Sequence, residues 1–180
     1  FFPLYCAKIP QGELLAGENS QPSMADELTL ITGAAGEIGH GLLNSLGAAE
    51  PDRLLALDRN PPELDLRGRC REFIQGDVLD EALLADLGKR YPIGTIYHLA
   101  AVLSTRAEQD PRASHRVNVE GTFNLLQLAV DQTQRRDEPV RFVFPSSVAV
   151  YGFSTRAAKR AAGPQTEQTP FHPRSPYGVS

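Results

Sequence analysis

Short apolar segments alternate with helical segments along most of the chain, and this alternation constrains the fold more than any other feature. Buried strands are predicted by apolar, β-branched runs at residues 28–32, 53–58, 71–77, 95–101 and 141–147. Helices are predicted by leucines at helical spacing in residues 36–49, 79–90 and 110–133. Strands that alternate with helices at such short intervals form parallel β-α-β units with right-handed crossovers. The sequence therefore predicts an α/β fold with a doubly wound parallel sheet and a ligand site at the carboxyl ends of its strands.

One domain of this kind is expected from 180 residues with 41% hydrophobic and 22% charged residues. Residues 1–23 carry no period and precede the single methionine, Met24, so we interpret them as an irregular extension and residues 24–180 as the domain. The net charge of -4 gives no reason to expect nucleic acid or a membrane surface as a partner. Cys6 and Cys70 fit neither a redox motif nor a zinc spacing, which is typical of unpaired thiols and favours the cytoplasm.

The stretch "TGAAGEIG" places Gly33, Gly36 and Gly39 directly between a predicted strand and a predicted helix. Such glycines allow a tight turn, close approach of the backbone to a pyrophosphate, and close helix packing, although spaced glycines also occur in plain turns. Asp58 ends the second strand, where a carboxylate accepts hydrogen bonds from an adenosine ribose and repels a 2′-phosphate, so NAD is favoured over NADP. Arg59 beside it is the residue that would instead pair with that phosphate.

Two further residues of this region have alternative interpretations. Asp77, followed by Val78 in "GDV", is predicted to hydrogen-bond the adenine amino group, and the alternative is a cap for the helix that follows. For Asp58 the alternative is likewise a cap, of the turn that begins "RNPP". For Asp77 the capping role and the cofactor-binding role can hold at once.

A second candidate site combines the end of the fifth strand with the last residues of the chain. Oxidation of a secondary alcohol by a nicotinamide cofactor needs a base, and a tyrosine serves when a nearby cation favours its phenolate. A lysine four positions later on a helix shares the face of the tyrosine, which explains the spacing Y-x-x-x-K. Tyr177 in "RSPYGVS" supplies the first half, and the lysine position would follow Ser180. Ser147 is predicted to hold the substrate oxygen beside Tyr177, whereas Ser146 is predicted to be structural.

From about Leu28 to Ser180 the residues resemble the extended short-chain dehydrogenase/reductases, and within them the NAD-dependent epimerase/dehydratase family. The motifs that carry the resemblance, in order, are "TGAAGEIG", Asp58, "GDV", "HLAA", "VNVEGT", "PSSVAVYG" and "TEQTPFHPRSPYGVS". The resemblance implies a Rossmann-type sheet that is truncated before its sixth strand and substrate-binding portion. It also implies NAD as cofactor, a small-molecule substrate, and a homodimer formed through the long helix after the fourth strand.

The resemblance further implies the roles of individual residues. Ser147 and Tyr177 are implied to be catalytic, and Asn118 is implied to position the nicotinamide side, although an asparagine in a helix also bonds a carbonyl one turn back. His98 is interpreted as a packing residue at the strand end, and no metal site is expected. The predicted cofactor-binding residues are Gly33, Gly36, Ile38, Gly39, Asp58, Arg59, Asp77, Val78, Leu99, Ala100, Ala101 and Asn118.

The chain departs from the family pattern in two ways. Glu37 occupies a turn position where the family usually has an aromatic or amide residue, and the expected lysine is absent. We therefore expect the chain to be a fragment of a larger enzyme. If it were complete, a cofactor-binding module without turnover would be the alternative.

The substrate is predicted to be a nucleotide sugar, because "TEQTPFHPRSPYG" looks like the segment before the tyrosine in the sugar-nucleotide members of the family. "DRNPPE" and "AAVLS" look somewhat like the L-threonine dehydrogenase branch, which stays as the alternative. Val148 and Ala149 stand where a dehydratase carries an Asp-Glu pair, so an epimerase or dehydrogenase is favoured. The basic residues Arg156, Lys159 and Arg160 are interpreted as a solvated face, with attraction of a diphosphate as the alternative.

Overall fold

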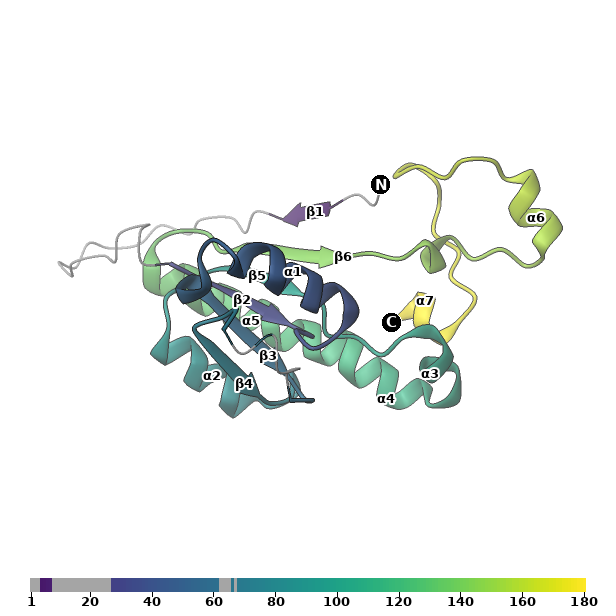
Figure 1. Cartoon of the computed structure of the whole chain (residues 1–180). Helices are drawn as coiled ribbons and strands as arrows, with labels where there is room; N and C mark the ends of the chain where they lie inside the picture. Colours follow the sequence, from purple (N-terminus) through teal and green to yellow (C-terminus); the bar gives the residue numbers. More distant parts are fainter. Residues whose placement is uncertain (1–3, 8–26, 62–65, 67) are drawn as a thin grey trace.

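A six-stranded sheet forms the centre of the computed structural model, which describes residues 4–7, 27–61, 66 and 68–180 (Figure 1). The strands are β1 (Leu4–Ala7), β2 (Leu28–Thr32), β3 (Leu54–Asp58), β4 (Glu72–Gln75), β5 (Ile93–His98) and β6 (Arg141–Pro145). Their order in the sheet is β1-β6-β5-β2-β3-β4. Strands β2 to β6 pair in parallel, as predicted, and β1 pairs antiparallel with β6.

The expectation of an irregular extension over residues 1–23 does not hold for residues 4–7, which form β1. The rest of that extension and the predicted start at Met24 lie outside the described residues, as do Pro62 and Glu63 of "DRNPPE". Strands β4 and β5 end earlier than predicted, at Gln75 and His98. In both cases the residues that follow turn away from the sheet and form loops at its carboxyl edge.

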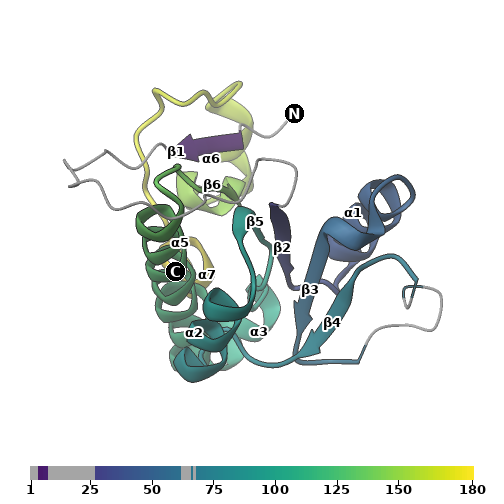
Figure 2. The ribbon, with the colours of Figure 1, turned by 90° about the vertical axis from the view of Figure 1, so that its left-hand side faces the viewer.

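Helices cover both faces of the parallel sheet (Figure 2). On one face, α1 (Glu37–Gly47) packs through the buried Leu43 against Ile31 and Ala56. On the other face lie α2 (Glu81–Arg90) and α5 (Gly121–Arg136), which pack with the alternate strand residues such as Leu30 and Leu57. Side chains of one strand therefore serve both layers, because successive residues point to opposite faces. This arrangement confirms the predicted doubly wound architecture.

The long helix predicted over residues 110–133 is divided into three parts. It consists of α4 (Pro111–His115), a π-helical turn η4 (Arg116–Glu120), and α5, which continues to Arg136. A short helix α3 (Ser104–Gln109) precedes it. Because π turns are rare and concentrate at functional sites, η4 marks the stretch that contains Asn118 for attention.

The segment after β6 leaves the sheet and returns to the helices α3 and α4. It contains a 3₁₀ turn η5 (Val148–Tyr151), a helix α6 (Arg156–Ala161) that lies away from the sheet, and α7 (Pro176–Val179), which lies beside α3 (Figure 1). The returning chain is joined to η5 by a backbone bond from His172 N to Val150 O of 2.9 Å. No helix in the described part of the chain has the length and apolar character needed to cross a membrane.

Candidate functional site at the carboxyl edge of the sheet

The glycine turn between β2 and α1 has no room for a side chain at Gly33 or Gly39. Gly33 has a φ of +68°, and a Cβ there would lie 2.6 Å from the Ala100 nitrogen and 2.8 Å from the Leu99 oxygen. Gly39 lies against the Gly33 carbonyl, so a Cβ at that position would collide with the turn itself. Gly36 is exposed and immediately precedes α1. The bare backbone at this helix N-terminus fits the pyrophosphate of a dinucleotide.

Asp58 is attached to the glycine turn by its carboxylate. The backbone nitrogen of Ala35, in the middle of the turn, donates to Asp58 Oδ2 at 3.0 Å, and the nitrogen of Asn60 donates to Oδ1 at 2.8 Å. The second bond is the turn cap that the sequence analysis gave as the alternative interpretation. Each carboxylate oxygen accepts more than one hydrogen bond, so the half-buried group retains acceptor capacity for a ribose.

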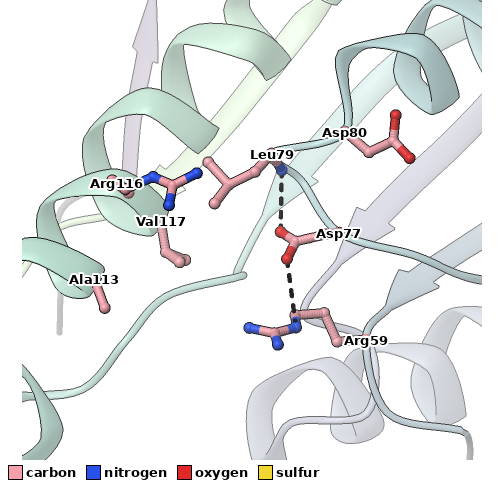
Figure 3. Close-up of a pocket in the computed structure, with 7 residues that line it drawn as sticks. All are labelled: Arg59, Asp77, Leu79, Asp80, Ala113, Arg116 and Val117. Atoms are coloured by element: carbon pink, nitrogen blue, oxygen red, sulfur yellow. Dashed lines mark hydrogen bonds and ion pairs between the residues drawn. The ribbon is translucent and has the colours of Figure 1, made fainter.

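Asp77 holds Arg59 across the ends of β3 and β4 (Figure 3). Its Oδ1 accepts a hydrogen bond from Leu79 N at 3.0 Å, and its Oδ2 pairs with Arg59 Nε at 3.4 Å. The alternative prediction that Asp77 caps α2 is wrong, because Asp80 is the capping residue and accepts from Leu83 N at 2.9 Å. Asp77 instead forms its own tight turn at the strand end, which leaves its carboxylate facing the loop after β3.

A pocket of about 460 Å³ lies between these strand ends and the helices α4 and η4 (Figure 3). It contains the Arg59–Asp77 pair on one side and the side chains of η4 on the other. The residues that line it are Arg59, Asp77, Leu79, Asp80, Ala113, Arg116 and Val117. Val78 does not line the pocket, because its side chain is buried in the core, where it would contact a Cβ placed on Gly121. Any contact of Val78 with a cofactor would therefore be made by its backbone.

His98 ends β5 with both ring nitrogens hydrogen-bonded. Nδ1 lies 2.8 Å from Thr32 Oγ1, and Nε2 lies 3.0 Å from Thr122 Oγ1. The Thr122 hydroxyl donates its hydrogen to the Asn118 carbonyl at 2.6 Å, so toward His98 it must accept. Nε2 therefore carries the ring proton, and Nδ1 accepts from the Thr32 hydroxyl, which in turn accepts from Ala100 N at 3.4 Å.

The His98 ring is 1% exposed and lies close to the rings of Phe142 and Phe144. Burial lowers the pKa of His98 from 6.5 to about 4, so the imidazole is neutral at pH 7. The interpretation of His98 as a packing residue was therefore incomplete, because its two hydrogen bonds connect β2 to α5.

Asn118 projects from the π turn η4 and holds the loop that follows β5. Its Oδ1 accepts from Val102 N at 2.7 Å, and its Nδ2 donates to Val102 O at 3.1 Å. The same Nδ2 lies 3.3 Å from Ser114 Oγ and 3.2 Å from Ser180 Oγ. The alternative in which Asn118 bonds a carbonyl one turn back is wrong, because the group one turn back that it contacts is the Ser114 hydroxyl.

The segments that carry Ser147 and Tyr177 pack directly against each other. Ser147 precedes η5, where its Oγ accepts from Ala149 N at 3.2 Å. Tyr177 lies in α7, whose first turn is capped by the Ser175 hydroxyl. A Cβ on Gly178 would lie 2.6 Å from the Ala149 oxygen, so only a glycine allows α7 to approach η5 this closely.

Comparison with known proteins identifies the family. The model of the NAD dependent epimerase/dehydratase family matches residues 29–180, which is most of the chain. The chain belongs to this family. NAD is therefore its cofactor, and the glycine turn described above fits that cofactor.

Relatives in the NAD-dependent epimerase/dehydratase family include dehydrogenases as well as epimerases. D-erythronate dehydrogenase of Haemophilus influenzae is 32% identical over 169 residues, a match that covers 83% of this chain and 45% of the relative. L-threonine dehydrogenase of Clostridium difficile superposes with a TM-score of 0.69 at 29% identity, over 86% of this chain and 45% of the other. UDP-glucose 4-epimerase of Brucella ovis, in complex with NAD, superposes with a TM-score of 0.67 at 28% identity. The match covers 85% of this chain and 44% of the epimerase chain. The chain thus spans less than half the length of these family members.

Two of the predicted cofactor-binding residues of this family member, Ile38 and Ala101, have exposed side chains. Ile38 is 67% exposed, and Glu37 beside it is exposed as well. The basic residues of α6 lie on the segment that leaves the sheet (Figure 1). Among the described residues, no group of three or more histidine, cysteine or acidic side chains could hold a metal ion.

The sequence analysis missed the residues that connect the site internally. These are Thr32, Val102, Ser114, Thr122 and Ser180, together with Arg116 in the pocket wall. One signal was available, since Asn118 and Thr122 are four residues apart and so share a helical face. The partners of that face, however, come from β5 and from the loop after it.

Proposed function

We propose that the chain is the cofactor-binding part of an NAD-dependent enzyme that removes hydride from a secondary alcohol of a nucleotide sugar, as a 4-epimerase does. The observation that carries the proposal is the close packing of α7 on η5, where Gly178 meets the Ala149 carbonyl. This packing joins the segment of Tyr177 to the segment of Ser147 at the carboxyl edge of the sheet. Membership of the NAD-dependent epimerase/dehydratase family supports the class of reaction.

The residues of the carboxyl edge have distinct roles in this proposal. The glycine turn holds the pyrophosphate, and Asp58, fixed by Ala35 N and Asn60 N, accepts hydrogen bonds from the adenosine ribose. Asp77 faces the adenine side, and its pairing with Arg59 occupies the cation that would otherwise attract a 2′-phosphate. The loop 99–101 lies against the cofactor, which the contact of its backbone with Gly33 supports.

Tyr177 and Ser147 act on the substrate hydroxyl. Ser147 Oγ accepts a hydrogen bond from Ala149 N, so its own hydrogen is available to a substrate oxygen. Tyr177 takes the proton of the substrate hydroxyl as general base. When bound, NAD supplies the acceptor for the hydride, which leaves the carbon that carries this hydroxyl. The lysine four positions beyond Tyr177 stays a prediction, as do the homodimer and the cytoplasmic location.

A nucleotide sugar is the favoured substrate because the segment from Glu167 to Tyr177 resembles the sugar-nucleotide members, and structures similar to this chain include UDP-glucose 4-epimerase. A dehydrogenase of a smaller alcohol is the second candidate. The relationship to D-erythronate dehydrogenase and to L-threonine dehydrogenase, at 32% and 29% identity, supports it equally well.

The test is an assay of the complete natural protein with UDP-glucose and UDP-galactose, and in parallel with L-threonine and D-erythronate. Interconversion of the two UDP-sugars without net NADH is the result expected for the proposal. Net formation of NADH with L-threonine or D-erythronate, without epimerisation of the UDP-sugars, would establish the second candidate instead. A Tyr177→Phe variant serves as the control that the activity belongs to this site.

A further inference from the structure

The loop of residues 99–103, which follows β5, is held by side chains at two points. Near its start, Ala100 N donates to Thr32 Oγ1, and further on both backbone groups of Val102 bond to the Asn118 side chain. At the first of these points the backbone of Leu99 and Ala100 leaves no room for a Cβ on Gly33. The loop and the glycine turn are therefore in direct contact.

Asn118, which forms the second holding point, lies in the π turn. In such a turn a carbonyl accepts from the nitrogen five residues on, as Arg116 O does from Gly121 N. The Asn118 carbonyl accepts from the Thr122 hydroxyl at 2.6 Å. The orientation of Asn118 toward Val102 is thus coupled to the position of the Thr122 side chain.

The two holding points are linked through His98. Its Nδ1 accepts from Thr32, and its Nε2 donates to Thr122, so an unbroken chain of hydrogen bonds runs from Ala100 N to the Asn118 carbonyl. His98 is 1% and Thr32 0% exposed. Thr122 itself is half-buried, and removal of its hydroxyl leaves the buried Nε2–H of His98 without its partner.

We infer that His98 and Thr122 are positioning residues that hold loop 99–103 against the glycine turn and so set the affinity for the cofactor. Neither residue is one of the predicted cofactor-binding residues; His98 acts through Thr32, and Thr122 acts through Asn118. The inference rests on the proposed placement of NAD beside this loop. It adds to that placement the two residues that hold the loop in position.

The experiment uses a pair of substitutions at Thr122 in this chain. Thr122→Val keeps the shape of the side chain and removes the hydroxyl, whereas Thr122→Ser keeps the hydroxyl. The control is Thr133→Val on the same helix, because Thr133 also donates to a carbonyl four residues back, Ala129 O at 2.8 Å, and accepts from a backbone nitrogen. It lies at the other end of α5, away from the loop.

NAD affinity is measured by calorimetry, amide exchange of Val102 by NMR, and the protonated nitrogen of His98 by its ring ¹⁵N shifts. We expect the Nε2–H tautomer in the wild-type chain. For Thr122→Val we expect about tenfold weaker NAD binding, the worth of one buried hydrogen bond, together with faster exchange at Val102. Thr122→Ser restores both, and Thr133→Val leaves NAD affinity unchanged.

Two results would overturn the inference while NAD still binds to the wild-type chain. One is an Nδ1–H tautomer of His98, and the other is equal NAD affinity of Thr122→Val and Thr133→Val. Absence of NAD binding by the folded wild-type chain is a different outcome. It would refute the placement of the cofactor itself, and the inference with it.

Discussion

The stability of the protein is expected to depend on pH because His98 is buried and neutral. Its folded-state pKa of about 4 lies below its ordinary value of 6.5, so the unfolded chain binds a proton between these values that the folded chain does not. Stability is therefore lost as the pH falls through this range, by about 3 kcal/mol in total at about 1.4 kcal/mol for each pH unit. About 2 kcal/mol of this is expected to be lost between pH 7 and pH 5.

The assay is urea unfolding of the wild-type chain and of His98→Gln at both pH values. Glutamine does not titrate and keeps an amide for hydrogen bonding, so the variant is less stable at pH 7 but lacks this contribution to the pH dependence. Carboxylates that titrate near pH 5 affect both proteins alike, and the difference between the two proteins isolates His98. If both proteins lose the same stability between pH 7 and pH 5, His98 is not a buried neutral group.

Further predictions concern the chemistry, the cofactor and the stability of the fold. Tyr177→Phe in the complete natural protein should lower turnover by about 100-fold to 10,000-fold and leave the NAD dissociation constant nearly unchanged, because only the base is lost. Asp58→Ala should weaken NAD binding by about tenfold, because the ribose hydrogen bonds are lost, and NADP binding much less. Calorimetry measures both affinities. Gly33→Ala should destabilise the fold by about 1–3 kcal/mol and abolish NAD binding, because Gly33 has a positive φ and no space for a Cβ. Gly41 lies in α1 with open space around it. Gly41→Ala should therefore stabilise the fold by about 0.5–1 kcal/mol, as measured by thermal unfolding.

Each of these predictions has a result that contradicts it. Unchanged turnover of Tyr177→Phe removes the tyrosine from the mechanism. Equal weakening of NAD and NADP by Asp58→Ala would mean that the carboxylate serves only as the turn cap seen at Asn60. If Gly33→Ala and Gly41→Ala behave alike, the turn is not the tight cradle that we describe.

The elements of the fold could be predicted because their signals are local. The run Leu28–Thr32 and the spacing of Leu42, Leu43 and Leu46 report a strand and a helix through a few neighbouring residues. Where prediction failed, a tertiary contact intervened. Asp77 and Asp80 are both acidic residues shortly before α2, and only the geometry of the strand end decides that Asp80 is the cap.

Sequence patterns predict the parallel sheet, the glycine turn, the acidic residue at the end of β3 and the family. These properties depend on periodicity, on glycines at a turn and on the order of motifs, all of which are visible along the chain. The tertiary structure alone decided that His98 connects Thr32 to Thr122, that Asn118 holds Val102, and that α7 packs on η5. The physical reason is that a hydrogen bond depends on two atoms meeting within about 3 Å. Residues as far apart in the chain as Thr32 and His98 meet only after β2 and β5 have paired in register.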